Sequence, residues 1–191
     1  MYPTLNEKRG ELFITQFKIV PVVGLQKFVS QSGIVMTRNT GIHRFEFEVR
    51  IQCFGEANIR YMQSFLSSNV GSPFYISPRP EVQATPQTPS TVAFQAQAGA
   101  KSVQVSGHRG PFLYGDYIVF DNHPKIYNVI SDLKGSTGSI EINPPLRKNL
   151  PVGTSVLVQP PLLVTLVEEN FEFAFDDVYW SASFSFKVSE V

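Results

Sequence analysis

The chain has 191 residues, which suits one large domain or two small ones. Hydrophobic residues make up 42% and charged residues 17%, a composition that excludes an intrinsically disordered chain. Sixteen acidic residues balance sixteen basic ones, which argues against a general nucleic-acid binder, and the single cysteine, Cys53, excludes a disulfide-stapled domain.

The first half of the chain is predicted as a hairpin followed by a helix. No signal peptide is expected, because residues 1–10 contain Glu7, Lys8 and Arg9 with no apolar run behind them. Residues 43–52 alternate with period two and predict a half-buried strand. Its apolar face is Phe45, Phe47, Val49 and Ile51, and its polar face is Arg44, Glu46, Glu48 and Arg50.

Asn39-Thr40-Gly41 is predicted as the turn from an upstream strand, Lys27 to Arg38. A helix is predicted from Glu56 to about Ser67, with Gly71 as a stop signal. Its apolar stripe is formed by Ile59, Met62, Phe65 and Leu66. A single amphipathic helix in a strand-rich chain is expected to lie across one face of a sheet.

The middle of the chain is predicted as a proline-rich linker followed by a small β-barrel. The linker covers about residues 77–91 and is expected to be extended. Short strands with turn residues about every ten positions are typical of a small barrel or sandwich. These strands are predicted at Val92–Gln97, Ser102–Ser106, Tyr117–Phe120, Ile126–Ile130, Ser139–Asn143 and Ser155–Gln159.

The C-terminal segment is predicted as a strand hairpin. An uncharged stretch between Lys148 and Glu168 has the length of a membrane span, but Pro151, Pro160 and Pro161 argue against a helix, so no membrane insertion is expected. After it, Phe171, Phe173 and Phe175 alternate with other residues, as do positions 178–188. Asp176-Asp177 is predicted as the turn between the two strands.

These elements together predict a mainly β fold with two domains. An isolated hairpin is marginally stable, so residues 1–77 and 160–191 are expected to form one split β-sandwich domain with one helix. Residues 78–159 are expected to form an inserted small barrel, because a longer loop costs entropy only logarithmically.

No catalytic, cofactor-binding or metal-binding residue is predicted, and we expect no enzyme. His43, His108 and His123 share no metal-ligand spacing with one another or with Cys53, which is expected to be a buried, inert thiol. The stretch 106–110, SGHRG, lacks the following helix of a phosphate loop and is predicted as a β-turn. No Gly-x-Ser-x-Gly motif is present, and adjacent strand residues such as Asp176 and Asp177 point apart.

A binding module is the alternative from another class. Small barrels bind glycans or single-stranded nucleic acid through exposed aromatic residues, and Phe112, Tyr114, Tyr117 and Tyr127 are the candidates here. The near-balance of charge between residues 91 and 160 disfavours nucleic acid and leaves a host glycan open. Burial of these aromatic residues in the barrel core is the competing interpretation.

Several motifs, in order and spacing, resemble the distal tail proteins of long-tailed bacteriophages, in the variant with an inserted oligonucleotide/oligosaccharide-binding (OB)-type barrel. In the first domain they are Ser30-Gln31-Ser32-Gly33, Arg38, the stretch 41–49, Met62-Gln63-Ser64-Phe65-Leu66 and the stretch 71–76. In the insert they are Gly115-Asp116-Tyr117-Ile118, the stretch 125–129, the stretch 142–147 and Gly153. The resemblance begins at about residue 28 and excludes the linker.

The resemblance implies a structural virion protein at the tail tip. Such proteins form a hexameric ring that continues the tail tube and supports the baseplate hub or tail-tip proteins, so the implied partners are further copies of the chain, the tube protein and the hub. DNA passes only through the lumen. Another tube, tail-completion or baseplate subunit is the close rival.

An acidic cluster near the C-terminus suggests a role in that lumen. Its members are Glu168, Glu169, Glu172, Asp176 and Asp177. We expect some of these carboxylates to face the lumen, where like charge keeps the phosphate backbone from adhering. An ordinary solvated face and turn explain the same residues equally well.

Overall fold

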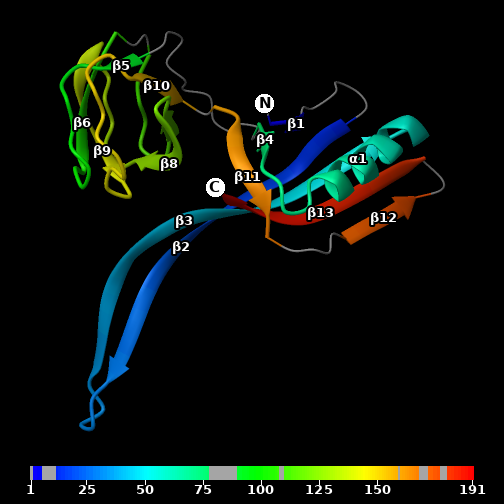
Figure 1. Ribbon diagram of the computed structural model, residues 1–191, viewed down its shortest axis with the longest axis horizontal. Helices are drawn as coiled ribbons and strands as arrows, with labels where there is room; N and C mark the ends of the chain where they lie inside the picture. Colours follow the sequence, from blue (N-terminus) through cyan, green and yellow to red (C-terminus); the bar gives the residue numbers. More distant parts are fainter. Residues whose placement is uncertain are drawn as a thin grey trace. The chain divides into compact units, whose positions relative to one another are not determined.

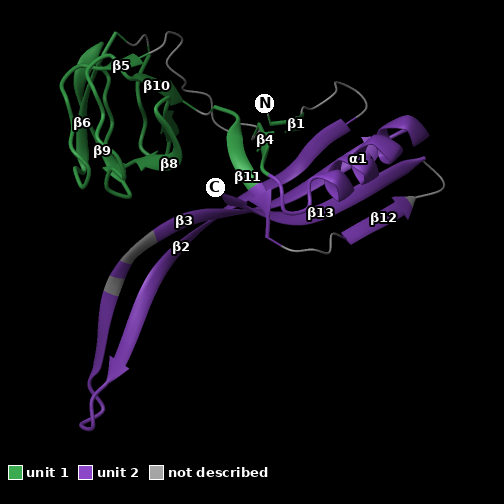
Figure 2. Ribbon diagram, in the orientation of Figure 1, with its two compact units in different colours: residues 1–6, 73–164, 191 green, residues 7–72, 165–190 purple. Residues whose placement is uncertain are grey.

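The computed structural model describes residues 2–5, 12–77, 90–107, 110–158, 160–167, 172–176 and 180–191, with backbone only at 39, 41, 42 and 176. Over these residues the chain is mainly β with one helix, as the sequence predicts, and it contains a sheet and a closed antiparallel barrel (Figure 1). It divides into two compact units (Figure 2): unit 1 comprises residues 1–6, 73–164 and 191, and unit 2 comprises residues 7–72 and 165–190. The domain boundaries at 77 and 160 stay a prediction.

The sheet of unit 2 is antiparallel throughout. Its strands are β2 (Leu12–Val29), β3 (Val35–Phe54), β13 (Ser181–Glu190) and β12 (Glu172–Asp176). β3 lies between β2 and β13, and β13 is paired with β12 and also neighbours β11 (Leu162–Leu166) in the sheet order. β13 pairs with β3 from Ser181 opposite Phe54 to Ser189 opposite Glu46. The predicted C-terminal hairpin is confirmed by the pairing of β12 with β13, while Asp177 of its predicted turn lies outside the described residues.

Helix α1 (Glu56–Ser68) confirms the predicted helix almost residue for residue. Gly55 precedes it at φ 80, a conformation that glycine adopts without steric cost, and its N–H donates to the Trp180 carbonyl at 2.9 Å. Asn69 ends the helix by donating from its backbone and from Nδ2 to the Phe65 carbonyl. Among the described residues no helix is long and apolar enough to cross a membrane.

The predicted hairpin turn at Asn39-Thr40-Gly41 is wrong. These residues lie inside β3, and the chain reverses between Val29 and Val35. Gly33, at φ 78, donates its N–H to the Ser30 carbonyl in that reversal. The turn-forming residues instead lie opposite a register shift between Val23 and Leu25, where Thr40 Oγ1 donates to the Gly24 carbonyl at 2.9 Å. Gly and Asn therefore mark a strand irregularity here and not a strand end.

Unit 1 contains a small strand cluster and the barrel. In the cluster, β4 (Phe74–Ile76) pairs parallel with β1 (Thr4–Leu5) and antiparallel with β11 (Leu162–Leu166). The barrel closes in the order β10-β5-β6-β9-β8-β7. Its strands are β5 (Ser90–Val92), β6 (Ser102–Ser106), β7 (Tyr117–Phe120), β8 (His123–Val129), β9 (Thr137–Asn143) and β10 (Ser155–Val158).

The barrel strands match the predicted ones with one exception. The strand predicted at Val92–Gln97 is wrong, because β5 ends at Val92. The side chain of Val92 lies in the barrel core, whereas that of Phe94 is 66% exposed. Aliphatic and aromatic side chains fill the barrel, as expected for a barrel too small for a channel. Its largest core residues are Phe112, Phe120 and Tyr127.

Candidate functional site

The two faces of the sheet in unit 2 differ sharply in character. On β3, alternation buries Phe45, Phe47, Val49 and Ile51, as predicted, and β13 adds Phe184, Phe186 and Val188 to the same face. Helix α1 packs on β3 and β13 and buries Ile59, Met62, Phe65 and Leu66. The opposite face bears the polar side chains, and we call it the polar face.

Cross-strand rows organise the polar face. One row places Lys18 of β2 beside Glu48 of β3 and Lys187 of β13. A second row runs across the sheet from β2 to β12 through Gln16, Arg50, Ser185 and Glu172. Directly opposite residues on antiparallel strands interact, so the first row places Glu48 between two cations, whereas in the second row Ser185 separates Arg50 from Glu172.

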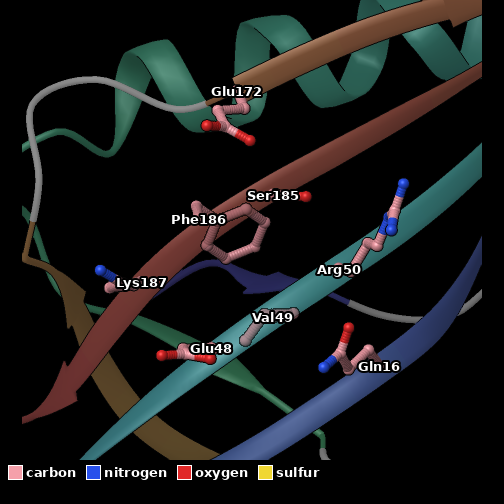
Figure 3. Close-up of a pocket in the computed structure, with 8 residues that line it drawn as sticks. All are labelled: Gln16, Glu48, Val49, Arg50, Glu172, Ser185, Phe186 and Lys187. Atoms are coloured by element: carbon pink, nitrogen blue, oxygen red, sulfur yellow. The ribbon is translucent and has the colours of Figure 1, made fainter.

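These rows enclose a depression of about 290 Å³, the candidate functional site (Figure 3). It is lined by Gln16, Glu48, Val49, Arg50, Glu172, Ser185, Phe186 and Lys187. The side chains come from β2, β3, β13 and β12, so the site belongs to the sheet and not to a loop. Neither histidine nor cysteine is among the residues that line it, so an imidazole base and a thiolate nucleophile are absent from its described wall, and its ionisable groups are Glu48, Arg50, Glu172 and Lys187.

Ion pairs neutralise part of the polar face. Lys18 Nζ lies 3.0 Å from Glu48 Oε2, and Arg44 Nη2 lies 2.7 Å from Glu46 Oε1. Both pairs are solvent-accessible, so each contributes at most about 1 kcal/mol to stability. Their larger effect is on the surface potential of the polar face, because each carboxylate offsets the charge of a cation that faces the solvent there.

The predicted acidic cluster is only partly described. Glu172 lies on the polar face, opposite Ser185. The backbone of Asp176 pairs with Ser181 at the end of β12, while Glu168, Glu169 and Asp177 lie outside the described residues. The described charged side chains of the polar face have both signs. The expectation that carboxylates of the acidic cluster face a lumen stays a prediction.

Cys53 is a fully buried thiol, as predicted. It lies on the apolar face of β3, opposite Ala182, and has no exposed surface. Burial raises its pKa to about 12, because the thiolate loses its hydration there. The thiol therefore stays protonated at neutral pH and is neither a nucleophile nor a metal ligand.

Histidines lie in both units. His43 is buried in β3, and His123 is buried at the start of β8. His108 lies outside the described residues, as does Arg109 of the predicted turn. Across the described ranges no group of three or more His, Cys, Asp or Glu residues is placed to hold a metal ion.

His123 belongs to a hydrogen-bonded network in the barrel. The Tyr127 hydroxyl accepts from the Arg147 N–H at 3.0 Å and is also hydrogen-bonded to His123 Nε2 at 2.7 Å. The other ring nitrogen, Nδ1, is hydrogen-bonded to Asn122 Oδ1 at 2.5 Å, so both ring nitrogens have a partner. Burial, and then the charges of Lys148, Arg147 and Lys125, lower the pKa of His123.

The aromatic platform predicted for the barrel is wrong as a set. Phe112 and Tyr127 are completely buried in the core, and Tyr117 is half-buried. Only Tyr114 among the four is exposed, at 73%. Core packing is therefore the role of the two buried rings, because inward-facing positions of a small barrel are filled by side chains.

No protein-family model matches the chain, and no curated protein matches its sequence.

Sequence reasoning missed an exposed apolar feature of unit 2. The distal part of the β2–β3 hairpin, residues 23–38, extends beyond α1 and β13, and we call it the arm (Figure 1). Its exposed apolar residues are Val23, Leu25, Phe28, Val29, Ile34, Val35 and Met36. The signal in the sequence is that residues 19–29 lack the apolar–polar alternation of a half-buried strand. A continuous apolar run indicates a strand with apolar side chains on both faces.

Proposed function

We propose that the chain is a structural subunit of a ring at the distal end of a phage tail, where it joins the tail tube to the baseplate or tail-tip hub. The observation that carries this proposal is the sheet of unit 2, whose apolar face is covered by α1, whose other face is polar, and whose outer strands, β2 and β12, have no further strand paired to them among the described residues. The order of motifs described above supports the same assignment. We further propose that the barrel is of the OB type.

Open sheet edges supply a physical route to the ring. Strand direction alternates across β2, β3, β13 and β12. Placing β12 of one copy beside β2 of the next therefore continues the antiparallel pattern from subunit to subunit. Such a head-to-tail contact closes into a ring when the rotation between copies allows it, and closure removes the exposed edges.

The polar face suits the wall of a channel through which DNA passes. Two of its cations, Lys18 and Arg44, are held by Glu48 and Glu46. DNA affinity rises with the number of phosphates that unpaired cations neutralise, so paired cations leave a surface of low affinity. In the proposed assembly DNA is a passenger, and the binding partners are neighbouring copies, the tube protein and the hub.

The mass of the purified full-length chain tests the ring. We expect multi-angle light scattering to give six times the 21.4 kDa of one chain, and electron microscopy to show closed rings with a central hole. A 21.4 kDa particle at every concentration, with no rings, would contradict the proposal. If that monomer also bound glycans on an array, a carbohydrate-binding module would replace the ring subunit as the assignment.

A further inference from the structure

Unit 1 contains a depression of about 410 Å³, which we call the barrel pocket. Its described wall joins side chains of the strand cluster, Tyr75 of β4 and Leu163 of β11, to side chains of β7, β8 and β10 in the barrel. Apart from Asp121, Asn122 and His123, the lining residues are aliphatic, aromatic or proline. Pockets of this volume and character bind small molecules with a largely apolar body.

Tyr75 gives the barrel pocket an aromatic ring that is already held in place. Its side chain is half-buried and packs edge-on against Tyr2, with ring centroids 6.3 Å apart. Leu157, which is 40% exposed, lines the pocket from β10. A flat ring and an accessible aliphatic side chain favour a compact ring as the body of the ligand, and binding requires little further ordering of Tyr75.

A basic loop adjoins the polar corner of the barrel pocket, at Asn122 and His123. Asn122 Nδ2 donates to the Asn149 carbonyl at 3.0 Å. The Arg147 N–H donates to the Tyr127 hydroxyl, which is also hydrogen-bonded to His123 Nε2. These hydrogen bonds hold the loop of residues 147–149 against the wall of the pocket.

The cations of this corner outnumber its carboxylates. Arg147 and Lys148 are exposed, and within the described part of the chain neither has a carboxylate at ion-pair distance. Lys125 follows His123 by two positions in β8, so alternation places both on one face of that strand. Burial, and then the charges of these three cations, lower the pKa of His123. Asp121 is the one carboxylate of the described wall, so a ligand with a single anionic end fits best.

We propose that the barrel pocket binds a phosphate monoester with a compact, uncharged ring as its body, the phosphate at Arg147 and Lys148 and the ring against Tyr75. A phosphate group accepts charge-assisted hydrogen bonds from guanidinium and ammonium groups, and arginine binds it bidentately. Aryl phosphates and sugar phosphates share this chemistry. The site lies within unit 1, so the inference goes beyond the proposed ring and does not depend on it.

Calorimetric titration of the full-length chain tests the class of ligand. The probes are phenyl phosphate, glucose 1-phosphate and inorganic phosphate, each titrated separately. We expect at least one ester to bind one site per chain at least about tenfold more tightly than inorganic phosphate, because only the esters also fill the apolar part of the pocket. The ester that binds more tightly identifies the body as aryl or sugar. Equal affinity for all three probes, or no binding, would overturn the inference.

Charge-matched variants test the position of the phosphate. Arg147→Gln/Lys148→Gln is expected to weaken binding of that ester at least about tenfold, because both charge-assisted contacts are lost. The matched control, Lys101→Gln/Lys134→Gln, removes the same charge from two exposed residues of unit 1 that do not line the pocket, and it is expected to bind like the native chain. Equal weakening in both variants would show a general effect of net charge and overturn the assigned site.

Tyr75→Ala separates the contact of the ring from that of the phosphate. This variant is expected to lose the advantage of the ester over inorganic phosphate, and circular dichroism of every variant checks that the fold is retained. Unchanged ester affinity would overturn the placement of the ring. Light scattering on the same samples keeps the two proposals apart. A monomer that binds the ester would support the barrel pocket and contradict the ring, whereas a hexamer that binds no ester would do the reverse.

Discussion

At the scale of single residues, burial decides the chemistry of the cysteine. The pKa of Cys53 rises from 9.0 to about 12, so at pH 8 its thiolate fraction falls about a thousandfold relative to an unperturbed thiol. We expect a disulfide reagent such as DTNB to leave Cys53 unmodified in the folded protein and to modify it fully in guanidinium chloride. A Thr37→Cys variant, exposed on the arm, is the positive control. Rapid labelling of the native chain without denaturant would contradict the buried position.

The His123 network predicts a pH dependence of stability. The pKa of His123 is lowered in the folded barrel, so below about pH 6.5 the unfolded chain takes up a proton that the folded chain does not. Stability from the neutral imidazole is therefore complete above pH 6.5 and is lost as pH falls toward the folded pKa. We expect the melting temperature of the native chain to fall more between pH 7.5 and 5.5 than that of His123→Gln. Equal slopes for the two proteins would show that His123 does not carry the effect.

At the scale of elements, α1 contributes stability by covering the apolar face of the sheet. Leu66 is completely buried, so Leu66→Ala is expected to destabilise the protein by about 2–5 kcal/mol through lost burial and a residual cavity. Gln63, exposed on the same helix, is the control site, and Gln63→Ala is expected to change stability by less than about 0.5 kcal/mol. Urea unfolding followed by Trp180 fluorescence measures both. Equal small effects would mean that α1 does not seal this face.

The elements also show how far the sequence predicts the fold. Helix α1 and strand β13 were predictable because each has one strictly periodic apolar stripe. The hairpin turn was misplaced because Asn39-Thr40-Gly41 has turn composition, whereas the actual reversal at Ser30–Ile34 depends on Gly33 adopting φ 78. Local composition does not distinguish a turn from a strand irregularity, since both favour glycine and asparagine.

The candidate site was less predictable than the fold. The polar side chains of residues 44–50 follow from alternation, but the rows that place Lys18 beside Glu48 and Arg50 near Glu172 depend on register between distant strands. A register shift between Ile14 and Gln16 moves the rest of β2 by one position relative to simple alternation. Because a slip of one residue exchanges the two faces of a strand, period alone does not give this juxtaposition.

At the scale of the whole molecule, the proposed function requires that the polar face does not bind DNA. Glu46 and Glu48 each hold a cation on this face, Arg44 and Lys18 respectively. Releasing both cations makes the face basic without altering the apolar side of the sheet. In a closed ring every copy contributes the same change to one channel, so the effect on DNA affinity is multiplied by the number of subunits.

We therefore expect Glu46→Gln/Glu48→Gln to bind double-stranded DNA measurably while the native chain does not. The slope of log affinity against log salt concentration should steepen by up to about 0.9 for each phosphate newly contacted. The control is Glu56→Gln, which removes one carboxylate and frees Arg60 on helix α1, away from the polar face. Fluorescence anisotropy with a labelled duplex at 50 and 200 mM salt measures all three proteins. Equal DNA binding by the double variant and the control would show that the polar face does not line a DNA channel.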